Sequence, residues 1–365
     1  MDIRGVHISG ATINGLNALY AFTNFLFTTA GITGPTGPTL GNVYTSYSNV
    51  GNTWLQNTSF FNVTTPGYQQ WTVPASGTYK ITAAGARGGI NLYAASTYGN
   101  TWGNGAVISG SFYLQQGANV TVLVGQIPQP TATAGSYNGA GGGGGSFVVL
   151  NQSTPLIVAG GGGGTGAYAS PPTPWPHQAN GVNGTTNING TNSVNGAPGG
   201  VAGTGGNSHV NGNAVVSSNP YDGGAGGGFL SNGAGGVGGN IRTNTQQTSA
   251  GAGGQGYQSG AIGGYPASSY LTSESYGGFG GGGGGGPIAG GGAGGYSGGG
   301  GGWANTSPVS DGGGGGGSFI ANTVISSVAT SDGNYNGSNV YNAISITNLA
   351  AWNSNSGYVQ ITRIS

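Results

Sequence analysis

Apolar and polar residues alternate in several short runs of the chain, and turn signals separate most of these runs. Residues 67–86, GYQQWTVPASGTYKITAAGA, contain two runs around Pro-Ala-Ser-Gly, and Tyr79, Ile81 and Ala83 take alternate positions in the second. Residues 105–126 contain two more runs around a turn at 115–118. A period of two is typical of strands with one buried face, so we predict antiparallel strands in both regions.

Four further runs extend this pattern. SFVVL (146–150) and PLIVA (155–159) form one pair, and the chain closes with runs at 343–352 and 356–364. The last run alternates apolar Val359 and Ile361 with more polar neighbours. Short strands joined by turns are typical of an antiparallel sandwich. We therefore predict an all-β fold whose sandwich comprises residues 42–158 and 318–365.

Residues 1–41 are predicted to form an N-terminal arm. Alternation of apolar and polar residues in 6–13 suggests a strand. Residues 16–27 are the most apolar stretch of this region, and they are the one place where we consider a helix. Such a stretch would be an exposed apolar patch on a lone subunit. We therefore expect this stretch to dock into a neighbouring subunit or into a capsid or envelope protein. Deletion of residues 1–41 is then expected to leave a folded but unassembled protein. The assembly residues would be Leu16, Leu19, Phe22, Phe25 and Phe27.

Two Gly-Pro-Thr triplets follow within residues 31–39. Collagen requires many such triplets in unbroken register, which this segment lacks. The triplets are therefore interpreted as an extended connector that proline stiffens.

Residues 159–317 form a glycine-rich insert between the predicted strands. Ordering one residue costs about 1–2 kcal/mol, and an isolated extended glycine segment makes no internal hydrogen bonds in return. Several segments side by side can bond through their main chains, because no Cβ holds them apart. We therefore expect the runs to form a packed core and not a flexible linker. The runs lie at 160–164, 223–228, 280–286, 290–302 and 312–317.

The succession of strands and glycine runs resembles the glycine-rich domain family. The motifs that carry the resemblance are WTVPASGTYKITAAGARGG (71–89), GAVISGSFYLQQGANVTVLVGQ (105–126), GGGGGSFVVL with PLIVAGGGGG (141–164), GGGGGGSFI (312–320) and SGYVQITRI (356–364). That family includes the extracellular glycine-rich region of anaplastic lymphoma kinase and leukocyte tyrosine kinase, and many bacterial and viral proteins. The resemblance implies a tumour-necrosis-factor-like sandwich that carries a bundle of left-handed polyglycine II helices. The receptors' cysteines, acidic ligand contacts, kinase and membrane segment are missing here, so receptor function does not carry over.

Charge and cysteine content exclude several classes of partner. The chain has 365 residues, of which 87 are glycine, five are basic, five are acidic and none is cysteine. Five scattered basic residues cannot form a patch for nucleic acid or for an anionic membrane surface. No apolar run approaches the ~20 residues that span a bilayer. We expect no nucleic-acid partner and no direct membrane span.

Titratable residues do not form a catalytic or metal-binding pattern. The histidines lie at positions 7, 177 and 209, and the acids at 2, 222, 274, 311 and 332, none with metal-ligand spacing. Matches to Gly-x-Gly-x-x-Gly carry little information in so glycine-rich a chain. We expect no enzymatic activity, no cofactor and no metal.

Two groups of residues are candidates for surface chemistry. Sequons make Asn57, Asn62, Asn119, Asn151, Asn183, Asn189 and Asn336 candidates for N-glycosylation, although several sequons arise by chance in an Asn-rich chain. Aromatic residues in polar loops could contact a receptor or glycan, or could instead cap the glycine bundle. These residues are Tyr168, Trp175, Tyr257, Tyr265, Tyr270 and Tyr276, with Tyr296 and Trp303 in the same class.

Three functions remain open. The first is a non-enzymatic structural protein, such as a spike, fibre or coat component of a large DNA virus or a cell envelope, anchored by residues 1–41 and part of an oligomer. The second is an adhesin whose loops at 165–222 and 240–276 recognise glycans or cell-surface receptors. The third, a ligand-binding ectodomain, is disfavoured because no signal pattern or membrane segment is found. We predict a location on a virion surface or outside the cell.

Overall fold

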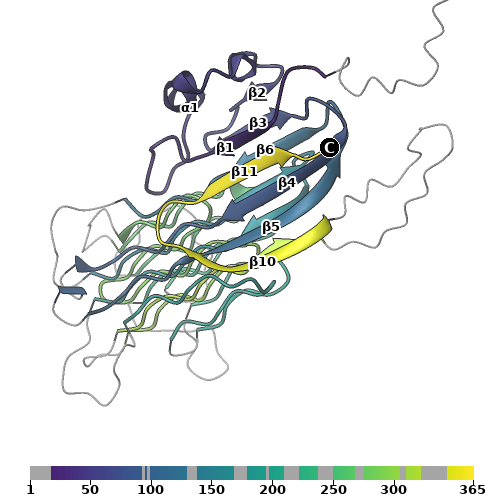
Figure 1. The fold of residues 1–365 in the computed structure, drawn as a ribbon. Coiled ribbons are helices and arrows are strands. Elements are labelled where there is room, and N and C mark those ends of the chain that lie inside the picture. The colour runs from purple at the N-terminus through teal and green to yellow at the C-terminus, as the bar shows by residue number, and fades with distance from the viewer. Residues whose placement is uncertain are drawn as a thin grey trace, which may run out of the picture.

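Two antiparallel sheets face each other in the computed structural model, which confirms the predicted all-β sandwich (Figure 1). The first sheet has the order β1 (Asn24–Phe27), β11 (Tyr358–Arg363), β4 (Gly77–Ala84), β5 (Gly105–Leu114), β10 (Ala343–Asn353). The second has the order β2 (Phe61–Asn62), β3 (Tyr68–Thr72), β6 (Asn119–Leu123), β7 (Ser146–Leu150), β8 (Thr154–Ala159), β9 (Phe319–Ile320). The structure describes residues 18–92, 95–96, 99–129, 138–167, 179–194, 197–208, 222–236, 250–267, 275–304, 310–321 and 343–365.

The main hydrophobic core lies between the two sheets. In β4 the buried residues Tyr79, Ile81 and Ala83 alternate with more exposed ones, as the period of two predicted. Ile81 pairs with Ile361 of β11 on one side and with Gly110 of β5 on the other. Burying a side chain of this size contributes ~1.5–3 kcal/mol, so the alternating positions fix the register of the sheet.

The second sheet is buried on both faces along β7 and its neighbours. All five residues of β7 are buried. Val148 and Leu150 belong to the main core, whereas Phe147 and Val149 belong to a second cluster on the opposite face. A strand covered on both sides needs apolar residues at every position, which explains why SFVVL shows no alternation.

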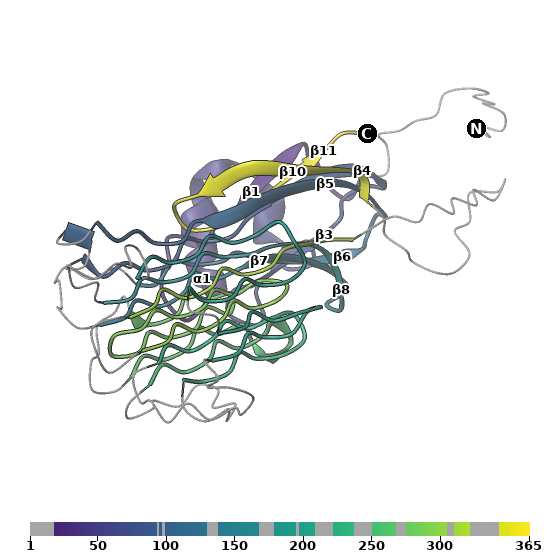
Figure 2. The same ribbon diagram turned by 90° about the horizontal axis from the view of Figure 1, so that it is seen from below.

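Glycine-rich segments cover the outer face of this second sheet. They run side by side beneath β6, β7 and β8 (Figure 2). Nearly all their described glycines are buried, although regular secondary structure in the described part of these segments is limited to η3 (Tyr257–Ser259) and helical residues at 92, 95–96 and 275. We call this part the glycine array, and it comprises the described residues of 85–104, 138–145, 160–236, 250–304 and 310–317.

Hydrogen bonds in the glycine array repeat every third residue, as segment 160–166 shows. The N–H groups of its residues 161 and 164 donate to the main-chain carbonyls of residues 294 and 291. Those of 162 and 165 donate to the carbonyls of 86 and 89, and those of 163 and 166 donate to the carbonyls of 182 and 179. Its carbonyl groups accept from 103 and 106, from 140 and 143, and from 313 and 316. The segment therefore bonds to six neighbours, three as a donor and three as an acceptor. The predicted core role of the glycines agrees with this extensive use of the main chain.

The N-terminal region differs from the predicted arm. Residues 24–27 form β1, which pairs with β11, and Phe25 and Phe27 are buried in the main core. The expectation that these two phenylalanines dock into another subunit is therefore wrong. No helix occupies 18–27, because alternate burial of Asn24–Phe27 suits an edge strand.

Helix α1 (Leu40–Tyr47) lies where the sequence predicted the start of the all-β region. Thr39 caps it, since the Asn42 N–H donates to Thr39 Oγ1 at 3.3 Å and the Thr39 N–H donates to Asn42 Oδ1 at 2.9 Å. Two 3₁₀ turns, η1 (Ser48–Val50) and η2 (Thr53–Gln56), follow. A helix of eight residues is too short to give a clear period in the sequence.

The Gly-Pro-Thr segment packs against the glycine array as well as connecting two elements. The Phe279 N–H donates to the Gly34 carbonyl at 2.7 Å, and the Gly263 N–H donates to the Pro35 carbonyl at 2.9 Å. A third bond, of 2.8 Å, joins the Gly67 N–H to the Pro38 carbonyl. The Gly34 and Pro35 carbonyls thus accept hydrogen bonds from the array, whereas the Pro38 carbonyl accepts one from outside it.

Candidate functional site

Described residues from several tracts meet at one end of the glycine array. In the sequence these tracts are separated by six stretches that lie outside the described residues, here called gaps. The Ala167 N–H donates to the Ile288 carbonyl at 2.7 Å, and the Gly236 N–H donates to the Gly251 carbonyl at 2.9 Å. Gly251 in turn donates to the Asp222 carbonyl at 3.0 Å. We call this the distal end, and it lies away from the marked C-terminus (Figure 1). The gaps are 130–137, 168–178, 209–221, 237–249, 268–274 and 305–309.

Two buried aspartates lie at the distal end. Asp222 and Asp311 have no exposed surface, and each directly precedes a glycine run. Asp222 Oδ1 accepts the Ala304 N–H at 2.9 Å, and the Asp311 N–H donates to the Trp303 carbonyl at 3.0 Å. The bond from the Ala304 N–H helps to offset the cost of burying the Asp222 carboxylate. Among the described residues, no group of three or more histidine, aspartate or glutamate side chains could hold a metal ion.

Two of the predicted contact tyrosines meet at the distal end. Tyr265 and Tyr276 are half-buried and pack edge to face, with ring centroids 5.4 Å apart. They flank the gap at 268–274, and the Ala252 N–H holds the Tyr265 carbonyl at 2.8 Å. Tyr168, Trp175 and Tyr270 lie outside the described residues.

Tyr257 was predicted as a contact residue, and this prediction is wrong because its side chain is only 4% exposed. Its ring stacks on Phe229 at 5.0 Å and packs on Phe147 at 5.2 Å. Tyr296 continues the stack beyond Phe229, at 6.0 Å, and Phe319 lies 4.4 Å beyond Tyr296.

These aromatic residues share a position in the sequence as well as in space. Each follows a glycine segment directly or after one serine, and together they cover the second cluster on β6, β7 and β8. Because glycine has no side chain to fix its register against a neighbour, these rings give each segment a defined end. We call this group the aromatic cap, and it comprises Phe147, Phe229, Tyr257, Phe279, Tyr296 and Phe319.

The sequon asparagines differ in exposure. Asn57, Asn151 and Asn189 are exposed, whereas Asn62, Asn119 and Asn183 are half-buried. Asn57 Oδ1 accepts the Ser59 N–H at 3.0 Å, and Asn189 Oδ1 accepts the Ala202 N–H at 3.2 Å. Both side chains therefore have their oxygen held by the main chain. Asn336 lies outside the described residues.

The remaining predicted assembly residues are divided between surface and core. Leu19 is 44% exposed, and Phe22 is half-buried against Trp71 with ring centroids 5.0 Å apart. Leu16 lies outside the described residues. Of the described assembly residues, Leu19 is thus the most accessible to a neighbouring subunit.

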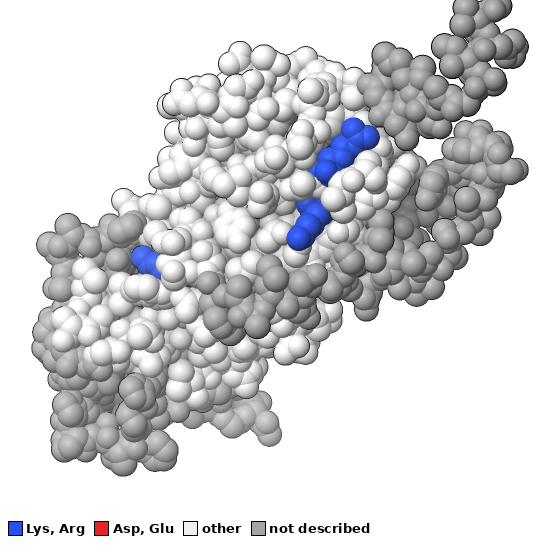
Figure 3. Space-filling view, viewed as in Figure 1, with Lys and Arg blue, Asp and Glu red and all other residues white. Residues whose placement is uncertain are grey.

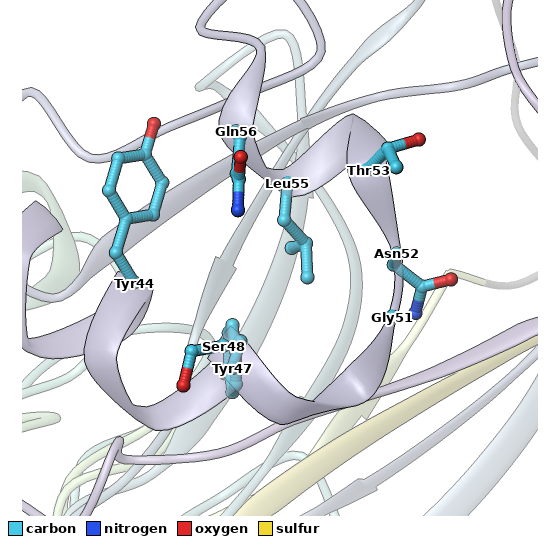
Figure 4. Close-up of a pocket in the computed structure, with 8 residues that line it drawn as sticks. All are labelled: Tyr44, Tyr47, Ser48, Gly51, Asn52, Thr53, Leu55 and Gln56. Atoms are coloured by element: carbon cyan, nitrogen blue, oxygen red, sulfur yellow. The ribbon is translucent and has the colours of Figure 1, made fainter.

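A cavity that the sequence did not predict lies between α1, η1 and η2 (Figure 4). It has a volume of about 360 Å³, with Tyr44, Tyr47 and Leu55 as its apolar part and Asn52 and Gln56 among its polar lining. The Tyr47 hydroxyl donates to Gln69 Oε1 at 2.9 Å and accepts the Thr28 N–H at 2.8 Å, so Tyr47 offers only its ring. Burial raises the pKa of Tyr47.

The cavity could accept a small uncharged group, because no charged side chain lines it. Tyr44 and Tyr47 lie three residues apart and share a face only once α1 is recognised. The spacing of Tyr44 and Tyr47 is the one sequence signal that could have indicated this cavity, and it cannot be interpreted unless the short helix is recognised.

Charged side chains are few on the described surface. The described basic residues are Lys80, Arg87 and Arg363, and the two described acids are the buried Asp222 and Asp311. Figure 3 accordingly shows isolated basic side chains on an otherwise uncharged face. None of the helices in the described part of the chain has the length and apolar character needed to cross a membrane. A comparison with models of known protein families finds no match to this chain.

Proposed function

We propose that this chain is a non-enzymatic structural protein displayed on the surface of a virion or a cell envelope. The observation that carries the proposal is the glycine array, in which buried tracts are joined through their main chains into one hydrogen-bonded body with few charged side chains on its described surface. Loops on a stiff scaffold can vary in sequence without disturbing the fold beneath them. The array would thus serve as a stiff platform for display.

We infer that the tracts of the array are left-handed polyglycine II helices in hexagonal packing, on a tumour-necrosis-factor-like sandwich. A threefold helix presents its N–H groups in three directions, one for each residue of a turn. The donors of segment 160–166 follow this rule, since residues three apart bond to the same neighbour. Its six neighbours are the number that hexagonal packing requires.

The particle we favour is that of a large DNA virus, in which the chain would be a spike, fibre or coat component within an oligomer. The surface poor in charge and the exposed Leu19 support contact with neighbouring subunits or capsid proteins. Because 24–27 belong to the sandwich, any anchor would use residues 1–23 and not the whole of 1–41.

A second candidate function is adhesion, in which the distal end recognises a glycan or receptor. The half-buried pair Tyr265 and Tyr276 favours it, because tyrosine combines a flat apolar ring with a polar hydroxyl. Glycans on the exposed Asn57, Asn151 or Asn189 would agree with a location outside the cell.

Antibodies against peptides 237–249 and 268–274 test the display proposal on intact particles or cells. We expect labelling without permeabilisation, and labelling only after disruption would contradict the proposal. Replacement of 268–274 by a Gly-Ser segment of equal length separates the two functions. If the chain serves only for display, both the original protein and the replaced variant assemble, and neither binds glycans or cells. If the chain is an adhesin, the original protein binds glycans or cells and the replaced variant does not.

A further inference from the structure

A groove along one edge of the glycine array combines fixed hydrogen-bond donors with an aromatic ring. It has a volume of about 610 Å³ and lies between segments 101–104 and 180–183, with Ser354 at its rim. The two segments are tied together by main-chain bonds, since the Gly181 N–H donates to the Thr101 carbonyl at 2.9 Å and the Gly184 N–H to the Asn104 carbonyl at 2.8 Å. The groove therefore has a rigid floor.

Three asparagine side chains in this groove have a chemically forced orientation. The Thr101 N–H donates to Asn180 Oδ1 at 2.9 Å, the Asn104 N–H to Asn183 Oδ1 at 2.8 Å, and Trp102 Nε1 to Asn104 Oδ1 at 3.2 Å. A carboxamide can accept a hydrogen bond only through its oxygen, because its NH₂ group is a donor. The oxygen of every carboxamide is thus held by the protein, and its NH₂ group is the part left for a ligand.

The spacing of these groups follows the period of the array. Asn180 and Asn183 lie three residues apart, opposite Thr101 and Asn104, which are also three apart. The two carboxamides therefore repeat along the groove. They form a row of donors, with the half-buried Trp102 ring beside it.

A positive charge lies next to this row. Arg87 Cζ is 4.5 Å from the centroid of the Trp102 ring, and Arg87 Nη1 donates to the Gly88 carbonyl at 2.6 Å. The main-chain N–H of Arg87 donates to the carbonyl of Asn355, the neighbour of Ser354. No acidic residue is among the described residues that line the groove. A matching ligand would offer several oxygen acceptors, a negative charge and an apolar face for the indole ring.

We propose that this groove binds a carboxylate-bearing saccharide. Ring oxygens and hydroxyl groups of the sugar accept from the carboxamide NH₂ groups, its carboxylate lies toward Arg87, and one face of its ring packs on Trp102. The groove uses no distal segment, so this inference stands apart from the proposed display role and can fail without it.

Calorimetric titration of the full chain, produced in a bacterial host that adds no N-linked glycan to Asn183, tests the proposal. The probes are 3′-sialyllactose, a hyaluronan tetrasaccharide, lactose as a neutral match, and a hexaglutamate peptide as an acidic non-sugar. We expect at least one acidic saccharide to bind at least tenfold more tightly than lactose and the peptide. Equal or tighter binding of lactose or the peptide, or no binding of any probe, overturns the proposal.

Substitutions N180D and N183D give a sharp second test. Aspartate retains an oxygen for the Thr101 or Asn104 N–H, so the fold is kept, while the outward NH₂ becomes a carboxylate oxygen. We expect each change to weaken acidic-saccharide binding at least tenfold, with thermal unfolding unchanged. The control N57D makes the same change at a side chain that also accepts a main-chain N–H, outside the groove, and should leave binding intact. Binding that survives N180D and N183D overturns the proposal.

Discussion

A Cβ atom on Gly163 would lie 1.9 Å from the carbonyl oxygen of Gly313. No real Cβ contact is so short, and main-chain atoms in a hydrogen-bonded array cannot move independently of their neighbours. The two segments therefore approach as closely as they do only because neither carries a side chain at this point.

Substitution G163A tests this close approach. Overpacking in a tight interior costs about 1–3 kcal/mol or more. We expect a loss of at least this size in the free energy of unfolding, measured by urea denaturation. G41A is the matched control, because Gly41 lies in α1 with only Thr39 Oγ1 within 4 Å, at 3.8 Å. Alanine there should leave stability unchanged or raise it, and an equal loss in both variants would contradict the packing argument.

The aromatic cap is predicted to stabilise the array strongly. Phe229 stacks between Tyr257 and Tyr296, so F229A leaves a cavity and should cost about 3–5 kcal/mol. The adjacent Leu230 is 49% exposed, and L230A should stay within about 0.5 kcal/mol of the wild type. Hydrogen exchange should also show faster exchange of the 223–228 amides in F229A alone. Similar stability in both variants would mean that the cap does not hold the array.

Strand β1 offers a test of the N-terminal region. Phe25 packs on Tyr47 and Trp54 with ring centroids 5.0 and 5.1 Å apart, whereas Leu26 is 48% exposed on the same strand. We expect F25A to lower the free energy of unfolding by about 3–5 kcal/mol. L26A should change it by about 0.5 kcal/mol or less. Deletion of 1–41 should unfold the protein, while deletion of 1–17 should not, and circular dichroism distinguishes the two results.

Stability is predicted to fall on the alkaline side. Burial raises the pKa of Tyr20, Tyr68 and Tyr257 above the ordinary value of 10.0. Above about pH 10 the unfolded chain releases these phenolic protons before the folded chain does. The unfolded state then binds fewer protons, so the free energy of unfolding is full below pH 10 and decreases as the pH rises further.

Absorbance at 295 nm checks this decrease, because it records tyrosinate directly. We expect a late phase that coincides with loss of the folded state. Y68F removes one of the buried phenols and should reduce the steepness of the alkaline decline. A single phase near the ordinary pKa, with the fold intact, would show that these phenols are not shielded.

Much of the sandwich could be predicted, because alternation at Tyr79, Ile81 and Ala83 directly encodes a buried strand face. Phe25 and Phe27 were assigned to an arm, since an apolar edge strand and an apolar docking segment have the same composition. The sequence also did not separate Tyr257, which is buried, from Tyr265, which is half-exposed. Both follow glycine-rich stretches, and only the position of each tract end in space distinguishes them.

The candidate sites were harder to predict than the fold. The cavity beside α1 depends on a short helix whose period is too brief to detect. The groove at Trp102 brings residues 101–104 together with 180–183, which are about eighty positions away in the chain. Contacts over such a separation follow from the order of the tracts, which no local pattern encodes.

The threefold bonding of segment 160–166 has a consequence for how such a protein can change over time. Inserting one residue into a tract would shift every donor beyond it by one position in this period of three and point each donor at the wrong neighbour. Insertions or deletions of three residues restore the alignment. Tract lengths should therefore drift among relatives in steps of three residues.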